Sequence, residues 1–484
     1  MVVSLIGLKS KLLNNIFVKA SSGYFLSNLL LKSTAILTAP IFTRLLSPSD
    51  YGITANFLAW ANILSIFVGL GLPYTVGNAK NDFPHKLMQY ITSIQILSSL
   101  AGLMALTIAI IMRRQLSNLL ELDSRLIVLI FVYILFLPPV VLFQEIYKYE
   151  LKYKNNIYIS VFNVVGGVIL CLLLIIFVFN NVRYYGRIIG MILPMFLMGI
   201  YFYRIMFQTR AENIKKYWSY SLRIAIPMIP HSIGMAAITQ IDRIMIFNIT
   251  GSAASGFYSF GFSFAVLITL FSGAIMQTYQ PILYERLKSN DFETIKNINT
   301  LVLATVSFVA IIIIGIGPEV IKLLGSKEFE QSKIVIPPLV IGFLFQFIYF
   351  SFSMIVSFYK RTTYIALGTI LTGIVNIVFN YVFIPKWGYF GAAAATTISY
   401  LMLVIYHMII AKHIAGEHVY NYRYIWYQML SATIAGVVIM QFYDDIISRY
   451  ATIIIILIFY VIFQKNYLLI IFKNIMKKQA IWTG

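Results

Sequence analysis

Charged side chains are scarce in this chain of 484 residues, since Asp, Glu, Lys and Arg make up 11% of it. An ordinary soluble domain carries about a quarter. Hydrophobic residues make up 60%, and the mean hydropathy is +0.84. A water-soluble fold of this length would lack the charges to cover its surface. We therefore expect a lipid bilayer as the solvent, in which each spanning helix needs about 20 apolar residues.

Cysteine and histidine are also rare, with one cysteine, Cys171, and five histidines. A single cysteine excludes an intrachain disulfide, and no Cys or His spacing fits a metal site. The connections between apolar runs are short, which leaves no room for a soluble catalytic domain. We therefore expect no enzyme, no metal and no cofactor, apart from H⁺ or Na⁺ as coupling ions.

The net charge of +20 arises from 37 Lys and Arg against 17 Asp and Glu. These basic residues recur in short loops, a pattern typical of a membrane protein beside anionic lipid rather than of a nucleic-acid-binding protein. With the N-terminus inside, the cytoplasmic loops carry more than twice as many Lys and Arg as the external loops. This distribution predicts that both termini are cytoplasmic.

Apolar runs of spanning length predict about 14 transmembrane helices. They lie near residues 24–45, 52–77, 89–112, 125–147, 157–179, 186–206, 223–248, 256–280, 299–317, 334–358, 363–384, 389–411, 424–443 and 450–472. The predicted fold is an all-α polytopic membrane protein. Its expected parts are a cytoplasmic amphipathic segment (1–22), a six-helix bundle (23–210), a second six-helix bundle (211–415), and two additional helices with a basic cytoplasmic tail (416–484).

An internal repeat at an offset near 204 residues supports the two-bundle arrangement. Ser47-Pro-Ser-Asp-Tyr-Gly52 corresponds to Gly251-Ser-Ala-Ala-Ser-Gly256, and each segment is followed by a glycine 17 residues later. Further matches occur at Phe143-Gln and Phe345-Gln, and at Tyr184-Tyr-Gly and Tyr389-Phe-Gly. A repeat of six helices keeps both halves in the same orientation. The halves are then related by a pseudo-two-fold axis along the membrane normal, with a cavity between them.

Ionisable residues inside membrane spans usually face a cavity. Lys32 shares a helix face with Asn28 in the first span, and Arg243 shares one with Ser232 and Thr239 in the seventh. We predict that these faces line one cavity with Lys32 nearer the cytoplasm, and that cationic groups there favour an anionic substrate. Two alternatives are snorkelling of Lys32 to the membrane surface and pairing of Arg243 with Asp242.

The chain resembles the multidrug/oligosaccharidyl-lipid/polysaccharide exporter superfamily, and within it the Wzx-type flippases of O-antigen and related glycans. The residues that carry this resemblance are Thr43-Arg-Leu-Leu-Ser-Pro-Ser-Asp-Tyr-Gly52, Gly69-Leu-Gly71, Asp242-Arg243, Gly256-Phe-Tyr258 and Pro281. The resemblance implies two helical bundles around a central cavity in the bacterial cytoplasmic (inner) membrane. It also implies translocation of undecaprenyl-pyrophosphate-linked glycan repeat units for O-antigen, lipopolysaccharide or capsule biosynthesis.

The family's basic lumen maps onto Lys32, Arg243 and Arg44. Asp242 is a candidate for ion coupling, although its role as a fixed partner of Arg243 is the simpler interpretation. Expected partners are the lipid-linked oligosaccharide, the bilayer, a glycan polymerase and a chain-length regulator, with no nucleic acid. Two transporters of the same superfamily remain as alternatives, a cation-coupled drug exporter and a lipid II flippase. A membrane glycan polymerase is a third, although such enzymes carry a long external loop.

Overall fold

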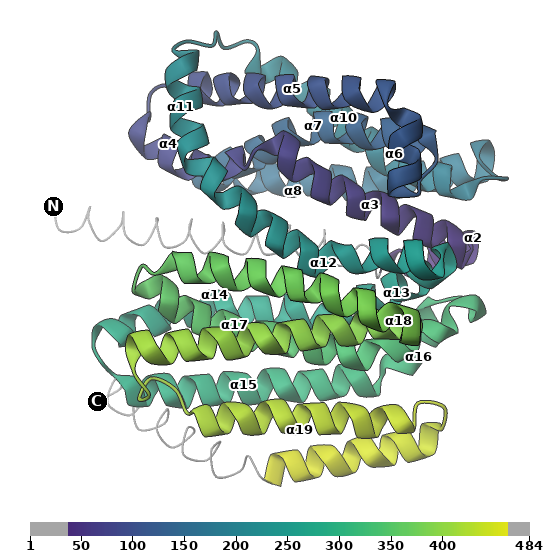
Figure 1. Cartoon of the computed structure of the whole chain (residues 1–484), viewed down its shortest axis with the longest axis vertical. Coiled ribbons are helices and arrows are strands. Elements are labelled where there is room, and N and C mark those ends of the chain that lie inside the picture. The colour runs from purple at the N-terminus through teal and green to yellow at the C-terminus, as the bar shows by residue number, and fades with distance from the viewer. Residues whose placement is uncertain (1–36, 463–484) are drawn as a thin grey trace, which may run out of the picture. The chain divides into compact units, whose positions relative to one another are not determined.

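The structure is a computed structural model that describes residues 37–462, and all regular elements among them are helical (Figure 1). Ten of these helices are long and apolar enough to cross a membrane. The chain is therefore an all-α multi-pass membrane protein, as the sequence predicted. The predicted amphipathic segment 1–22 and residues 463–484 of the predicted tail lie outside the described residues.

The described residues form two compact units that meet in sequence at Gly256 and Phe257. Helix α13 (Ser252–Ala265) contains this junction. The predicted domain boundaries at 210 and 415 stay a prediction.

Unit 1 contains α2 (Ala39–Leu45), α3 (Pro48–Gly69), η1 (Leu72–Thr75), α4 (Val76–Asp82), α5 (Leu87–Ile111), α6 (Arg113–Leu120), α7 (Ser124–Tyr149), α8 (Tyr153–Val161), η2 (Phe162–Gly166), α9 (Gly167–Leu173), η3 (Leu174–Val178), α10 (Arg183–Met206), α11 (Ile214–Ala225), η4 (Ile226–Met228) and α12 (Ile229–Thr250).

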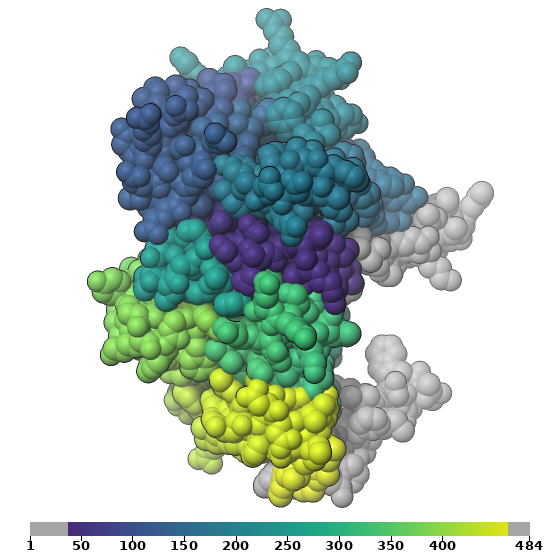
Figure 2. All heavy atoms as spheres, turned by 90° about the vertical axis from the view of Figure 1, so that its right-hand side faces the viewer, coloured from purple at the N-terminus to yellow at the C-terminus, as the bar shows by residue number. Residues whose placement is uncertain are grey.

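Unit 2 is built around one helix that is buried on almost all sides, α17 (Ile336–Phe358). Around it lie α14 (Leu267–Lys288), α15 (Phe292–Gly315), α16 (Gly317–Leu324), η5 (Lys327–Val335), α18 (Thr362–Ala415), α19 (Tyr422–Gln441) and an apolar helix Ile446–Ile462. The two C-terminal helices form the yellow surface in Figure 2. Their outward side chains are mostly large and apolar, as expected for helices that face lipid.

Helix α18 contains the two runs predicted at 363–384 and 389–411. Gly388 interrupts it with φ of 56° and ψ of −142°, a backbone conformation that only glycine adopts readily. The chain reverses there, so that Asn376 and Thr396 meet across the turn with 3.5 Å between their side chains. The number of fourteen spans stays a prediction, because the first run, 24–45, lies mostly outside the described residues.

Glycines on α10 let neighbouring helices approach its backbone within unit 1. A Cβ atom on Gly190 would lie 2.5 Å from the backbone nitrogen of Cys171, and one on Gly199 would lie 2.7 Å from the carbonyl oxygen of Phe136. Small residues at such positions are the usual means of helix packing in lipid, where burial of apolar side chains gives little driving force. Helices α7 and α9 are thereby held close to α10.

The two copies of the repeated motif contact each other at the start of α3 and α13. Helix α3 begins with a capping box in which the Ser47 hydroxyl and the Asp50 carboxylate each bind the other residue's backbone N–H. A Cβ atom on Gly52 would lie 1.8 Å from the carbonyl oxygen of Ser252, and one on Gly256 would lie 2.0 Å from that of Pro48. The hydroxyls of Ser49 and Ser252 lie 2.7 Å apart. This crossing tolerates no side chain at either glycine.

Candidate substrate-binding site

Helix α12 carries four of the residues that the sequence nominated. Arg243 is half-buried, and its Nη1 donates hydrogen bonds to the carbonyl oxygen of Thr239 at 2.8 Å and to Oε1 of Gln240 at 3.3 Å. Thr239 and Arg243 therefore lie on one face of the helix, as predicted. Both of these contacts are made within α12, so they hold the guanidinium close to its own helix.

Asp242, the neighbour of Arg243, is 1% exposed. It belongs to a buried stripe of α12 with Gly234 and Ile238, spaced four residues apart. Helix α12 packs along α3 within unit 1. Adjacent residues on a helix point about 100° apart, so Asp242 and Arg243 occupy different environments. The carboxylate is enclosed by protein while the guanidinium lies at the edge of the packed face.

Ser232 lies two turns before Thr239, near the start of α12. Its hydroxyl donates to the carbonyl oxygen of Met228 at 3.0 Å and lies 3.4 Å from the hydroxyl of Tyr74. Tyr74 is 54% exposed and belongs to η1, directly after the Gly69-Leu-Gly71 segment. Hydroxyl groups from η1 and α12 therefore meet at an accessible position, which the sequence alone did not indicate.

Arg44, on α2, is exposed, and its Nη1 donates to the carbonyl oxygen of Pro40 at 2.5 Å. Two further arginines approach α2 and the start of α3 from the start of α10. Nη1 of Arg183 donates to the carbonyl oxygen of Leu45 at 2.8 Å, and the guanidinium of Arg187 lies 4.1 Å from the ring centre of Tyr51. We name Arg44, Arg183 and Arg187 the arginine cluster. The sequence analysis assigned no functional role to Arg183 or Arg187.

Arg187 also stacks on Phe42, with 4.8 Å from guanidinium to ring centre. Its buried Nη1 has no hydrogen-bond partner within the described part of the chain. An arginine held by aromatic rings keeps its charge while its planar donors remain available to an anion. Unit 1 therefore presents cationic groups both at α12 and at the arginine cluster.

Two nominated residues, Asn28 and Lys32, lie outside the described residues. Their place in a cavity therefore stays a prediction, as do the binding roles of Arg44, Ser232, Thr239, Asp242 and Arg243.

Between residues 37 and 462, no group of three or more His, Cys, Asp and Glu is arranged to hold a metal ion. A buried cluster of neutral oxygen-bearing side chains does occur within α18 of unit 2. The Asn380 amide donates to Oδ1 of Asn376 at 3.0 Å, and the Asn376 amide lies 3.5 Å from the hydroxyl of Thr396. All three side chains are at most 1% exposed. The sequence analysis missed this cluster, because Asn and Thr are common in the chain and carry no charge.

Comparison with solved structures places the fold among known transporters. The chain superimposes on the lipid II flippase MurJ in an inward closed conformation with a TM-score of 0.70 and 16% identity, covering 93% of this chain and 100% of that one. It also matches a multidrug resistance MATE family transporter of the MOP superfamily in an inward-facing conformation, with a TM-score of 0.58 and 13% identity over 80% of this chain and 95% of that one. At these identities the likeness shows the fold alone.

Two protein sequences share short matches with the chain. The capsular polysaccharide biosynthesis protein CapF of Staphylococcus aureus is 25% identical over 215 residues, which cover 42% of this chain and 52% of that protein. An uncharacterized membrane protein of Haemophilus influenzae is 24% identical over 280 residues, covering 56% of this chain and 66% of that protein. The chain thus spans about half the length of the first of these relatives and just under two thirds of the second.

The strongest evidence of kinship is a match to the family described as polysaccharide biosynthesis protein, over residues 17–287. This segment is more than half of the chain. It includes both copies of the repeated motif, the arginine cluster and all of α12. The chain therefore belongs to the polysaccharide biosynthesis protein family.

Proposed function

We propose that this protein is a flippase that moves glycan repeat units on undecaprenyl pyrophosphate from the inner to the outer leaflet by alternating access. The family supports a role in making a polysaccharide, and the fold is that of transporters that include a lipid II flippase. The protein acts as a carrier rather than as an enzyme. Its site is the bacterial cytoplasmic membrane, with both termini in the cytoplasm.

The observation that carries this proposal is the reciprocal contact of the two repeat copies at Gly52 and Gly256. Two equivalent copies of one motif are typical of carriers that are built from internal repeats and open to each side of the membrane in turn. The charge distribution assigns the start of α3 to the external side. The contact at Gly52 and Gly256, both of which belong to unit 1, is therefore expected on the external side of the membrane.

Cationic side chains suit the pyrophosphate of the proposed substrate. Arg243 on α12 and Arg187 of the arginine cluster are half-buried. In such a partly shielded place, one charge pair at about 4 Å gains about 4 kcal/mol against about 1 kcal/mol in bulk water. We propose that Lys32 and Arg243 engage the head group in succession, and that Arg44 extends this path. Asn28, Ser232 and Thr239 would supply hydrogen bonds to the sugar.

Asp242 is our candidate for coupling transport to H⁺ or Na⁺. Its side chain is 1% exposed, and an ionisable residue inside a membrane span marks a pathway for ions or protons by default. The glycan polymerase and chain-length regulator that use the flipped repeat units are the expected functional partners.

Deletion of the gene in its host tests this proposal. We expect the surface glycan to lose its long-chain ladder while complete repeat units accumulate on their lipid carrier. Plasmid-borne wild-type protein should restore the ladder. The variant Arg243→Gln should restore it at least about tenfold less well, since it loses the charge contact between Arg243 and the pyrophosphate. Arg361→Gln, an exposed arginine in the α17–α18 turn, is the matched control. An unchanged ladder, or accumulation of peptidoglycan precursor instead, would contradict the proposal.

A further inference from the structure

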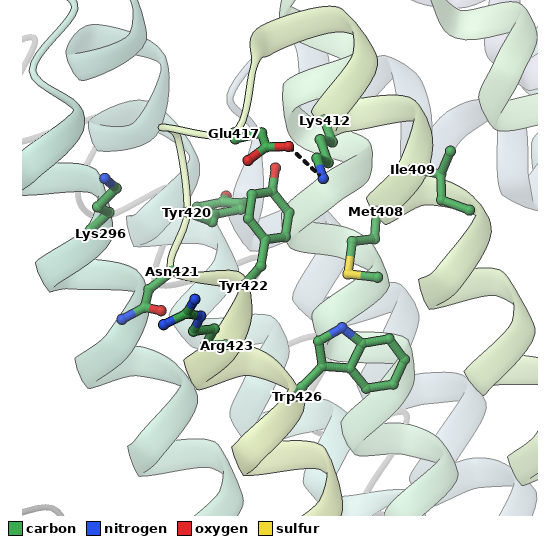
Figure 3. A pocket seen from close by; sticks show the side chains of 10 residues that line it. All are labelled: Lys296, Met408, Ile409, Lys412, Glu417, Tyr420, Asn421, Tyr422, Arg423 and Trp426. Carbon is green, nitrogen blue, oxygen red and sulfur yellow. Dashed lines mark ion pairs between the residues drawn. The ribbon is translucent and has the colours of Figure 1, made fainter.

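A cavity in unit 2 lies apart from every residue considered so far. It has a volume of 540 Å³ and is formed by the start of α15, the end of α18 and the start of α19 (Figure 3). Its lining consists of Lys296, Met408, Ile409, Lys412, Glu417, Tyr420, Asn421, Tyr422, Arg423 and Trp426. We name it the α15–α18–α19 cavity. Its size suits one phospholipid head group rather than an oligosaccharide.

Three cations from three different helices surround this cavity, with a single carboxylate among them. Lys412 forms an ion pair with Glu417 at 2.6 Å, drawn as the dashed line in Figure 3. Lys296, half-buried, and Arg423, exposed, form no ion pair with any described residue. Two cationic groups therefore remain for an anion after Glu417 has neutralised Lys412.

The cavity also contains the N-terminus of α19. The Asn421 side chain accepts a hydrogen bond from the Tyr424 N–H at 3.2 Å and so caps this helix of 20 residues. The helix dipole adds partial positive charge at this end of α19. Backbone donors and two side-chain cations thus converge, which is the arrangement that proteins use to hold a phosphate.

One side of the cavity is apolar and open to the surroundings. Ile409 is 59% exposed and Trp426 is 43% exposed, and Met408 lies between them in Figure 3. On α19 the exposed apolar surface continues from Trp426 at helical spacing through Leu430 and Ile434. A tryptophan at the end of an apolar face is typical of the membrane–water interface. A ligand in this cavity therefore meets cations at one end and a lipid-facing surface at the other.

We propose that the α15–α18–α19 cavity binds an anionic phospholipid of the surrounding bilayer, with the lipid phosphate between Lys296 and Arg423 and its acyl chains along α18 and α19. The lipid is a constituent of the membrane and not the transported molecule, so this site is separate from the proposed flippase function. A free phosphate ion would use the cations but not the apolar surface.

Native mass spectrometry of the purified full chain in detergent tests this site. Phosphatidylglycerol, phosphatidylcholine or inorganic phosphate is added, and bound lipid is counted for the wild type and two double variants. Lys296→Gln/Arg423→Gln removes the two unpaired cations of the cavity. Lys288→Gln/Arg361→Gln removes two exposed cations at the same ends of the unit 2 helices but outside the cavity, and serves as the matched control.

We expect the wild type and the control to bind one phosphatidylglycerol, and Lys296→Gln/Arg423→Gln to bind it at least about tenfold more weakly. Phosphatidylcholine should not replace it, and inorganic phosphate should not displace it. Equal losses in both double variants would overturn the proposal in favour of general surface charge. Displacement by inorganic phosphate, or equal binding of phosphatidylcholine, would also overturn it.

A second measurement guards against misfolding of the variant. Phosphatidylglycerol with brominated acyl chains should quench part of the tryptophan fluorescence of the wild type, and Trp426→Phe should remove that part. Trp387 is an exposed tryptophan outside the cavity. The variant Trp387→Phe should therefore keep the fluorescence that the brominated lipid quenches in the wild type. Quenching that is unaffected by Trp426→Phe would place the lipid elsewhere and refute the site.

Discussion

Gly52 and Gly256 hold the same position in the two copies of the repeat, and each faces a backbone carbonyl at the start of the other copy. Gly52 faces Ser252, Gly256 faces Pro48, and both relationships exchange under the offset of 204 residues. Exchanging the two copies of the motif turns each of these contacts into the other. Two segments related by a local two-fold axis must show such a reciprocal contact. The crossing is therefore a symmetric joint between the repeats.

The joint leaves no room for a methyl group, so Gly52→Ala should force α3 and α13 apart. We expect a loss of about 1–3 kcal/mol of stability from overpacking, together with reduced flipping. Gly273→Ala is the matched control, because a Cβ atom on this helical glycine meets nothing within 4 Å. Thermal unfolding in detergent measures both variants. Equal stability of the two variants would show that the crossing is not tightly packed in the membrane.

A disulfide at the joint should hold the starts of α3 and α13 together and block any motion that separates them. The hydroxyls of Ser49 and Ser252 lie 2.7 Å apart, close enough for cysteines at these positions to form a disulfide. We expect oxidised Ser49→Cys/Ser252→Cys to stop delivery of repeat units to the surface, and a reductant to restore it. Each single variant controls for the native Cys171, which is buried. Full activity of the oxidised double variant would contradict opening at this joint.

The sequence predicted the helices and the repeat because both depend on local patterns. Apolar runs in lipid must form helices, since each backbone polar group has to be satisfied within its own segment. The motif at Gly52 recurs at Gly256 because both copies meet the same packing requirement. The fold class and the correspondence of the two motifs could therefore be inferred without coordinates.

The environment of individual side chains could not be inferred in that way. Asp242 and Arg243 are neighbours in sequence, yet which of them is buried depends on how α12 rotates against α3. Arg187 reaches Tyr51 from a helix far along the chain, and no spacing rule links these positions. The cavity at α15, α18 and α19 was missed for the same reason, because its cations come from three separate helices.

The ion pair between Arg449 and Glu319 should contribute to stability. It lies at the end of the unit 2 helices opposite the α15–α18–α19 cavity. The Arg449 guanidinium is 2% exposed, pairs with Glu319 of α16 and donates to the carbonyl oxygen of Tyr443 at 2.6 Å. Arg449→Met leaves a partly buried carboxylate and a carbonyl oxygen without their donor, so we expect a loss of about 1–3 kcal/mol. Thermal unfolding in detergent provides the measurement.

The nearby pair of Lys333 and Asp444 provides a control for the Arg449 variant. The Lys333 Nζ lies 2.6 Å from the Asp444 carboxylate, but the Asp444 side chain is 89% exposed. Water competes for such a pair, so Asp444→Asn should cost at most about 1 kcal/mol. We predict that Arg449→Met loses more stability than Asp444→Asn because its ion pair is better buried. Equal losses in the two variants would contradict this role of burial.

Protonation of Glu417 should strengthen lipid binding in the α15–α18–α19 cavity. The hydrogen bond from Lys412, together with its charge, lowers the pKa of the Glu417 carboxyl below its ordinary value of 4.5. Because the folded pKa is depressed, the ion pair is complete at neutral pH and is lost only as the pH falls through that lowered value. Its loss leaves Lys412 available to the lipid phosphate as a third cation.

Phosphatidylglycerol affinity should therefore stay constant from about pH 8 to about pH 5 and rise only in more acidic solution. Glu417→Gln should show the raised affinity, about fivefold, already at neutral pH and no further rise on acidification. Glu285→Gln removes an exposed carboxylate from the end of α14 and should behave as the wild type. Lipid titrations followed by native mass spectrometry across this pH range provide the measurement. The variant Glu417→Gln has no carboxyl at position 417 to protonate. If its phosphatidylglycerol affinity rose on acidification as much as that of the wild type, the pH dependence would belong to the lipid or to another group.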